Sequence, residues 1–518
     1  MAGKSFINSA LILMAAGLVV RILGFFYRIY LSNLIGAEGM GLFQLIAPIY
    51  TLVILTLTSG VSIAVSKMVA EELARKHLAN LKRITACALA LVVVSGASIS
   101  VIMFIKLDFI TGVMLKDSRT YYSMLLLLPC IPVIAAASAL KGYFYGVQDV
   151  MPTAFSQIAE QVVRIGLVTL TASYFLKLGL EYACALATIG MALGEIANLI
   201  VLIIVYRFRK THSPGNMSKA GLLRKRTIFK NLLDISFPVA SNRFVTSIMF
   251  AAEVILIPRR LVAGGIDYQQ SIELYGKLTG MAMPLMFFPS LVTSSLATTL
   301  VPAISEAMSL RNMRSVNHRI SKSIQITFIL GFIFTAVFLA YPNEIGNLVY
   351  RKEDIGGILY SLSFTCVFIY LQQTLLGVLN GLGKQGISLR NSLIGYAIRI
   401  CFVYFLLPVY GINSYIWGIV ASYACVSVMN MYTVSRVSGM ALDVRNWVLK
   451  PGIVGVVMVL SGKYILSFFE IFSPSHTWTV VFAVTGNILA ALSLLLVFGV
   501  LDRREIARIF KQGQVKRK

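Results

Sequence analysis

The segment ITACALALVVVSGASISVIMFI (84–105) contains no charged residue along its whole length. A helix needs about 20 apolar residues to cross the roughly 30 Å hydrocarbon core of a bilayer. This run therefore predicts a membrane-spanning helix, and similar runs recur from one end of the 518-residue chain to the other. We expect fourteen spans, at residues 6–31, 42–66, 84–105, 121–146, 153–176, 182–206, 232–257, 274–302, 324–341, 358–380, 391–408, 414–435, 451–469 and 478–501.

The composition agrees with an all-α integral membrane protein. The chain is 58% hydrophobic and only 13% charged, whereas a soluble domain has roughly 25% charged residues. Its net charge is +25, but the basic residues lie in short loops between apolar runs. With the N-terminus inside, the inner segments carry 30 Lys and Arg and the outer loops carry 8. This bias predicts that both termini are cytoplasmic, and it argues against a nucleic-acid partner.

An internal repeat relates the two halves of the chain. GYFYGVQDVMPTAFSQIAEQVVRI (142–165) aligns without gaps to GVLNGLGKQGISLRNSLIGYAIRI (377–400). The alignment pairs Gly142 with Gly377, Gly146 with Gly381 and Arg164 with Arg399, and a slightly different offset pairs Asn198 with Asn430.

The repeat unit contains six helices, an even number, so both copies start on the same side of the membrane. Such transporters place the substrate between two parallel bundles. The predicted organisation is an N-lobe (1–206), a cytoplasmic linker (207–230), a C-lobe (231–435), and two further helices with a basic cytoplasmic tail (436–518).

Several cations fall inside the predicted spans. A lipid-exposed charge at mid-bilayer costs roughly 2.5–3.5 kcal/mol, so these residues should pair, reach the interface or face a wet cavity. Arg21 and Arg28 are two helical turns apart and share a face. We expect a cationic cavity formed by Arg21, Arg28, Arg243 and Lys277.

The acids within spans are fewer, and each leaves two interpretations open. Glu253 would either bind a coupling Na⁺ or H⁺ or pair with a nearby arginine. Glu160 and Arg164 are spaced i, i+4 and would form an internal ion pair or line the cavity. Arg399 is a further candidate for the cavity or an ion pair. The histidines and cysteines show no metal-ligand spacing, so we expect no metal site and no cofactor apart from a coupling ion.

Three segments carry a family resemblance: VVRILGFFYRIYLSNLIGAEGMGLFQ (19–44), VSIAVSKMVAEELARKH (61–77) and LATTLVPAISEAM (296–308). They resemble the stage V sporulation protein B family of the multidrug/oligosaccharidyl-lipid/polysaccharide exporter superfamily. The resemblance implies two six-helix lobes plus two helices, and movement of lipid-linked saccharides across the bacterial cytoplasmic membrane. The substrate expected for this branch is the undecaprenyl-diphosphate peptidoglycan precursor for spore cortex.

The resemblance also bears on the cations. Related peptidoglycan-lipid flippases carry the pattern RxLGFxR in the first helix. Arg21 matches its first arginine, whereas Tyr27 stands at the second position and Arg28 follows it. Lys277 is the nearest match to a cation that these relatives have at the start of the eighth helix.

Other functions remain as alternatives. One alternative is a flippase for another polysaccharide repeat unit. Another is a cation-coupled multidrug exporter, which should have an acidic cavity rather than a basic one. The chain has no DxD motif, no histidine within a span and no large loop, which disfavours a membrane glycosyltransferase and any other enzyme. A purely structural membrane partner is a weaker alternative. The expected partners are a lipid-linked saccharide, membrane lipid and cell-wall synthesis proteins.

Overall fold

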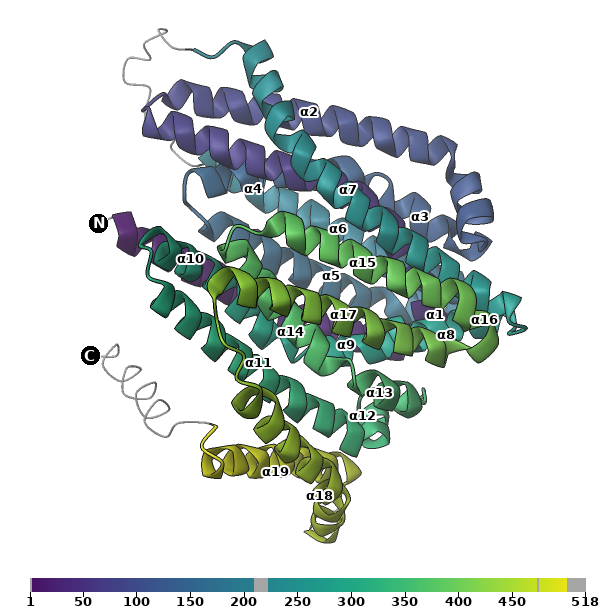
Figure 1. Ribbon diagram of the computed structural model, residues 1–518. Coiled ribbons are helices and arrows are strands. Elements are labelled where there is room, and N and C mark those ends of the chain that lie inside the picture. Colours follow the sequence, from purple (N-terminus) through teal and green to yellow (C-terminus); the bar gives the residue numbers. More distant parts are fainter. Residues whose placement is uncertain (1, 209–221, 473–474, 501–518) are drawn as a thin grey trace. The chain divides into compact units, whose positions relative to one another are not determined.

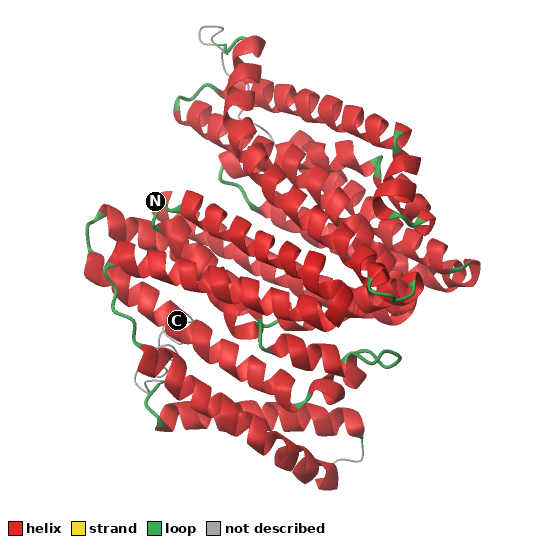
Figure 2. Ribbon diagram, turned by 45° about the vertical axis from the view of Figure 1, so that its right-hand side comes forward, coloured by secondary structure: helices red, strands yellow, loops and turns green. Residues whose placement is uncertain are grey.

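The computed structural model describes residues 2–208, 222–472 and 475–500, with the backbone alone for 2–14 and 472. All regular secondary structure in these ranges is helical (Figure 2), which confirms the all-α expectation. Residues 209–221 of the predicted linker and residues 501–518 of the predicted tail lie outside the described part of the chain.

The helices follow one another with short connections (Figure 1). In chain order they are α1 (Ala2–Ala74), α2 (Leu78–Ile105), η1 (Phe109–Leu115), η2 (Ser118–Thr120), α3 (Tyr121–Leu127), α4 (Cys130–Gly146), α5 (Met151–Leu178), α6 (Leu180–Phe208), α7 (Lys225–Ala263), α8 (Tyr268–Tyr275), η3 (Gly276–Ala282), α9 (Met283–Phe287), α10 (Ser290–Ser309), α11 (Met313–Ala340), α12 (Pro342–Val349), α13 (Gly356–Ser363), α14 (Cys366–Gly381), α15 (Gln385–Cys401), η4 (Phe402–Leu406), α16 (Leu407–Tyr410), α17 (Ile412–Ser438), η5 (Arg445–Leu449), α18 (Lys450–Phe472) and α19 (His476–Val497).

The long apolar helices are those of an integral membrane protein. Within the described residues, nine helices are long and apolar enough to cross a membrane, or up to eleven if two bent pairs each count as one span. One of the nine, Ala15–Ala74, has 60 residues, enough for more than one crossing at about 20 residues each. Helices α5 and α7, which carry in-span charges, are not among the nine. The described residues of the fourteen predicted spans are mainly helical, and the number of spans stays a prediction.

The connection between the first two predicted spans differs from expectation. The sequence predicted a loop at 32–41, but these residues are helical within α1 except for a break at Gly36, with φ 71° and ψ −177°. A positive φ is readily adopted by glycine, which has no Cβ. Leu31, Ile35 and Met40 around the break are buried, so apolar packing keeps this segment helical despite its Ser, Asn and Gly residues.

The chain divides into two compact units. Unit 1 comprises Met1–Arg259 with Asp267–Gly276, and unit 2 comprises Arg260–Ile266 with Lys277–Lys518. Ile228 and Leu232 of α7 belong to the same buried apolar cluster as Val61 of α1 and Ile84 of α2. The compact units therefore divide the chain close to the end of α7, after Arg259. The predicted lobes divide earlier, at residues 207–230.

The internal repeat corresponds to a repeated packing contact within each unit. An added Cβ at Gly142 of α4 would lie 2.7 Å from the Ser62 carbonyl oxygen of α1. At the matched Gly377 of α14, it would lie 2.6 Å from the Ala297 carbonyl oxygen of α10. Small residues let helix backbones approach closely in membranes, so both copies use glycine for the same contact.

The last two long helices extend unit 2. Helices α18 and α19 pack on each other, and α18 also packs on α11 (Figure 1). Their shared core contains Ile333, Val454, Met458 and Ala491. The two helices therefore attach to unit 2 through apolar side chains.

Candidate functional site

Helices α5 and α6 bring together an intramembrane polar group that we name the α5/α6 cluster, formed by Glu160, Arg164 and Asn198. Arg164 Nη2 lies 2.5 Å from Glu160 Oε1, and Asn198 Nδ2 donates to Glu160 Oε2 at 2.8 Å. The two charged side chains are 13–14% exposed. The structure thus contains the i, i+4 ion pair that the sequence offered as one interpretation, and it adds Asn198 to it.

Glycines in α6 allow this cluster to form. An added Cβ at Gly194 would lie 2.9 Å from the Glu160 carbonyl oxygen, and one at Gly190 would lie 2.6 Å from Val168 Cγ2. Because the two helix backbones approach closely, the short Asn198 side chain of α6 reaches the carboxylate on α5.

Helix α1 faces this cluster through Gly24 and Tyr27. An added Cβ on Gly24 would lie 3.9 Å from Gln161 Nε2, and Tyr27 is buried with its hydroxyl within electrostatic range of Arg164. Four buried polar atoms here have no hydrogen-bond partner among the described residues: Tyr27 Oη, Gln161 Oε1, Arg164 Nε and Asn198 Oδ1. Leaving such groups unpaired costs about 1–3 kcal/mol each, so this region is suited to bound water or a small polar ligand.

Sequence reasoning missed most of these neighbours. Tyr27 was noticed only because it replaces an arginine of the family pattern. Asn198 carried a weak signal, its pairing with Asn430 in the repeat. Gln161 carried none, because its proximity to α1 depends on tertiary packing.

The predicted cations of unit 1 lie on α1 and α7. Arg21 is exposed and Arg28 is half-buried on α1, while Arg243 is exposed on α7. A cation exposed within a membrane span is costly against hydrocarbon. Water, a polar partner within the protein or an anionic ligand is therefore the favourable environment for Arg21 and Arg243.

Lys277 belongs to unit 2 and has an acidic partner there. Its Nζ lies 3.3 Å from Glu353 Oε2, and both side chains are about one-fifth exposed, at 18% and 20%. Glu353 follows α12, outside every predicted span, so nothing in the sequence linked it to Lys277. The ammonium charge is compensated in this structure.

The remaining predicted residues have different surroundings. Glu253 of α7 is only 2% exposed, and it has an interaction partner in the structure. Arg399 of α15 donates from Nη1 to Ser422 Oγ at 3.0 Å. Its guanidinium carbon lies 4.4 Å from the centroid of the Tyr396 ring, which is within cation–π range.

A second polar group, outside the predicted spans, was not anticipated; we name it the Arg119 cluster. Arg119 contacts Glu38 at 2.5 Å and Asp117 at 2.8 Å. Tyr268 donates to Asp117 at 3.2 Å, and Gln269 donates to Glu38 at 3.0 Å. The hydrogen bond to Asp117 raises the pKa of Arg119, while burial and Asp117 together raise the pKa of Tyr268. The cluster holds the beginning of α8 to the rest of unit 1.

Comparison with known proteins identifies the family. Residues 6–308 match the family model described as polysaccharide biosynthesis protein. The chain is 30% identical to Stage V sporulation protein B of Bacillus subtilis (strain 168) over 511 residues, which cover 98% of each protein. The chain therefore belongs to the family of Stage V sporulation protein B. The resemblance recognised in the sequence is therefore confirmed.

Two further matches extend the comparison. The chain is 24% identical to Lipid II flippase MurJ of Bacillus subtilis (strain 168), over 74% of each protein. A solved structure titled "Lipid II flippase MurJ, inward closed conformation" matches with a TM-score of 0.71 at 13% identity, covering 96% of this chain and 100% of that chain. The structural match establishes the fold. The relatives confirm a membrane transport protein rather than an enzyme.

Proposed function

We propose that this protein is a flippase that moves a lipid-linked oligosaccharide across the bacterial cytoplasmic membrane by alternating access. The observation that carries the proposal is the family relation over nearly the whole chain, together with exposed arginines inside two of its predicted spans. The substrate we propose is the undecaprenyl-diphosphate peptidoglycan precursor used for spore cortex. In this proposal both termini are cytoplasmic, as the distribution of Lys and Arg indicates.

Arg21 and Arg243 would bind the diphosphate. A guanidinium forms two parallel, charge-assisted hydrogen bonds with phosphate oxygens, and its charge persists at every physiological pH. Both side chains are exposed on unit 1 helices, which suits a ligand that must enter and leave. Arg28, which is half-buried, and Lys277, whose charge is compensated by Glu353, would have smaller roles.

Transport would be coupled to Na⁺ or H⁺ through Glu253. Its burial in a membrane span supports this role, since intramembrane carboxylates commonly mark ion pathways. Glu253→Gln should then abolish any dependence of transport on Na⁺ or pH. Unchanged ion dependence in a folded Glu253→Gln protein would remove Glu253 from the mechanism.

The central experiment measures flipping of a fluorescent lipid-linked saccharide in liposomes that contain the purified protein. Arg21→Ala and Arg243→Ala should each stop transport while the protein still inserts and remains folded. Arg→Lys at either position should rescue only part of the rate, because an ammonium lacks the planar fork of a guanidinium. A site that merely stabilises the fold would instead lower expression, with little difference between Ala and Lys.

Lys463→Ala is the matched control. Lys463 is an exposed cation on α18, outside the proposed site, so its removal should leave transport near the wild-type rate. Near wild-type flipping by the double variant Arg21→Ala, Arg243→Ala would refute phosphate recognition by these two residues.

A further inference from the structure

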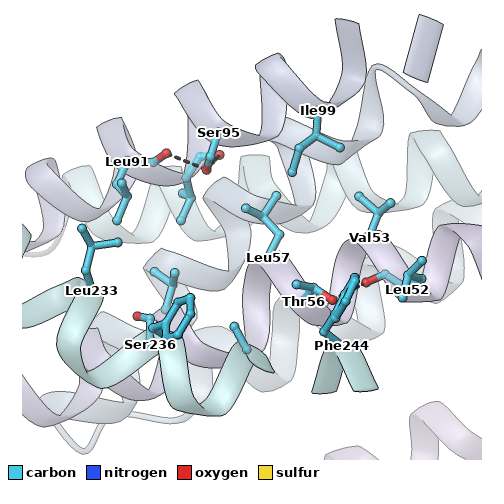
Figure 3. Close-up of a pocket in the computed structure, with 14 residues that line it drawn as sticks. Leu52, Val53, Thr56, Leu57, Leu91, Ser95, Ile99, Leu233, Ser236 and Phe244 are labelled. Carbon is cyan, nitrogen blue, oxygen red and sulfur yellow. Dashed lines mark hydrogen bonds between the residues drawn. The ribbon is translucent and has the colours of Figure 1, made fainter. Parts of the chain in front are cut away.

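Unit 1 contains a cavity of about 350 Å³ between α1, α2 and α7 (Figure 3). Drug-sized and cofactor sites occupy roughly 300–1,000 Å³, so the cavity is large enough for part of a ligand. Its lining residues lie within 52–61 of α1, 91–99 of α2 and 233–244 of α7.

The lining is almost entirely apolar in chemical character. The hydroxyl of Thr56 donates to the Leu52 carbonyl at 2.6 Å, and that of Ser95 donates to the Leu91 carbonyl at 2.7 Å (Figure 3). Both hydroxyls are thus used within their own helices. A buried water needs two to four polar partners, which these walls do not offer, so the cavity favours hydrocarbon.

Helix α7 forms one wall of the cavity and carries a pair of cations before that wall begins. Leu233, Phe237 and Phe244 lie on one face of α7, and all three are exposed. Arg226 and Lys230, also exposed, precede Leu233 by seven and three residues. At 3.6 residues per turn they fall on the same face. This face of α7 therefore begins with two cations, at the end predicted to be cytoplasmic. It continues as the α7 wall of the cavity, which from here on we also call the groove.

The groove has the length of one membrane leaflet. At 1.5 Å per residue, the wall from Leu233 to Phe244 extends about 16 Å, roughly half of the 30 Å hydrocarbon core. A hydrocarbon chain that starts at the headgroup level near Lys230 would therefore end close to the bilayer midplane. A single acyl chain of one leaflet fits these dimensions.

We propose that this cavity binds an acyl chain of an anionic phospholipid from the cytoplasmic leaflet, with the lipid phosphate at Arg226 and Lys230. Ser236 also lies in the wall, about 9 Å from Lys230 along the helix, and its hydroxyl is buried away from the cavity space. The wall therefore stays apolar at this depth.

The lipid would complete the packing of α7 on unit 1. At Gly60, an added Cβ would lie 2.4 Å from the Ser236 carbonyl oxygen, so the backbones of α1 and α7 touch there. Beyond Ser236 the cavity separates Phe237 and Phe244 from α1 and α2. A bound chain fills this gap and keeps the helix supported along its length.

The test uses the full-length protein in phosphatidylcholine liposomes that contain phosphatidylglycerol with a photoreactive acyl chain. Mass spectrometry of irradiated protein should find labels concentrated on residues 52–57, 91–99 and 233–244, in a saturable manner. Leu170 of α5 is 83% exposed and provides the reference for labelling by bulk lipid. Ala240→Phe and Ser95→Phe, which fill the groove from two different helices, should each abolish the excess over this reference, while Leu170→Phe should not affect it.

The headgroup half of the proposal is tested separately. Arg226→Gln and Lys230→Gln should each weaken phosphatidylglycerol labelling about fivefold, the equivalent of one cation–lipid contact. Labelling by a photoreactive phosphatidylcholine should change little in either variant.

Two results would overturn the assignment. One is labelling of the groove that does not exceed the labelling of Leu170 and that is unchanged in the Ala240→Phe and Ser95→Phe proteins, provided that these are folded. The other is displacement of the label by equimolar polyprenyl diphosphate, which would assign the groove to the tail of a transport substrate instead.

Discussion

The two copies of the internal repeat share their helix packing but differ in how they accommodate an intramembrane arginine. Arg164 and Arg399 occupy matched positions, one in each unit. Arg164 pairs with Glu160 one turn earlier, whereas the position matching Glu160 in the second copy is Gly395. Arg399 instead bonds to Ser422 and stacks on Tyr396.

The comparison shows which property each copy retains. Glycine contacts that fix helix spacing recur at Gly142 and Gly377, since any larger residue would separate the backbones. The positive charge recurs at Arg164 and Arg399, but the carboxylate that compensates it does not, because an arginine can be accommodated by a carboxylate or by aromatic rings and a hydroxyl. The two copies therefore share one helix packing, but the different partners of their matched arginines permit different functional roles.

The largest predicted loss of stability comes from removing the Glu160 carboxylate in the first copy of the repeat. Glu160→Ala leaves Arg164 uncompensated, which should cost about 3–5 kcal/mol of unfolding free energy. Arg399→Ala in the second copy should cost only about 1–2 kcal/mol, the worth of one hydrogen bond and one cation–π contact. Thermal unfolding of the purified variants in detergent measures both. Equal losses of Tm would show that the two arginines do not differ in this way.

The shared framework should respond equally in both copies. Gly142→Ala and Gly377→Ala each place a methyl group within 2.7 Å of a facing carbonyl oxygen, and overpacking of this kind costs about 1–3 kcal/mol. Gly166→Ala on α5 is the matched control because its added Cβ meets nothing within 4 Å. The control should be neutral or stabilising by up to about 1 kcal/mol. A large difference in Tm between Gly142→Ala and Gly377→Ala would contradict equivalent packing.

The Arg119 cluster of unit 1 should contribute a pH-independent stability. Because the pKa of Arg119 is raised, its contribution is complete throughout the physiological range and is lost only in strong alkali, as the pH rises through the folded value. Arg119→Gln should therefore lower stability by about 1–2 kcal/mol, by the same amount from about pH 6 to about pH 9. Unfolding of variant and wild type across that range measures the difference. A gap that closes within the range would show that another group titrates in the cluster.

The smallest predicted loss of stability concerns α18 and α19, the helices that follow the repeat. Asp443 precedes the helix that leads into α18, and it accepts from the Asn446 backbone and side chain at 3.1 and 2.7 Å. The Asn446 side chain lowers the pKa of Asp443. Because the folded pKa is lowered, the stabilisation is present above the unfolded value of 3.8 and is lost as the pH falls through the folded value. Asp443→Ala should cost about 1 kcal/mol at neutral pH and nothing in strong acid, as measured by unfolding at both pH values.

The all-α membrane class was predictable because long apolar runs identify membrane helices. The repeat located Gly142 and Gly377, and the i, i+4 spacing suggested the Glu160–Arg164 pair. Between the first two predicted spans the chain is helical on both sides of the break at Gly36, and Leu31 and Ile35 beside it are buried. Partners distant in sequence, such as Asn198 for Glu160 or Glu353 for Lys277, depend on tertiary packing that local spacing does not encode.

The division of the chain also has a consequence for biogenesis. The core of unit 1 contains Ile228 and Leu232, and the unit extends to Gly276. At roughly 5–20 residues per second, the ribosome needs about one to five seconds to synthesise residues 207–232 after the first six predicted helices. During that interval Val61 and Ile84 await their partners on α7 within the membrane. An insertion chaperone would therefore have most to protect at α1 and α2, and a chain that stopped at residue 206 would expose this surface permanently.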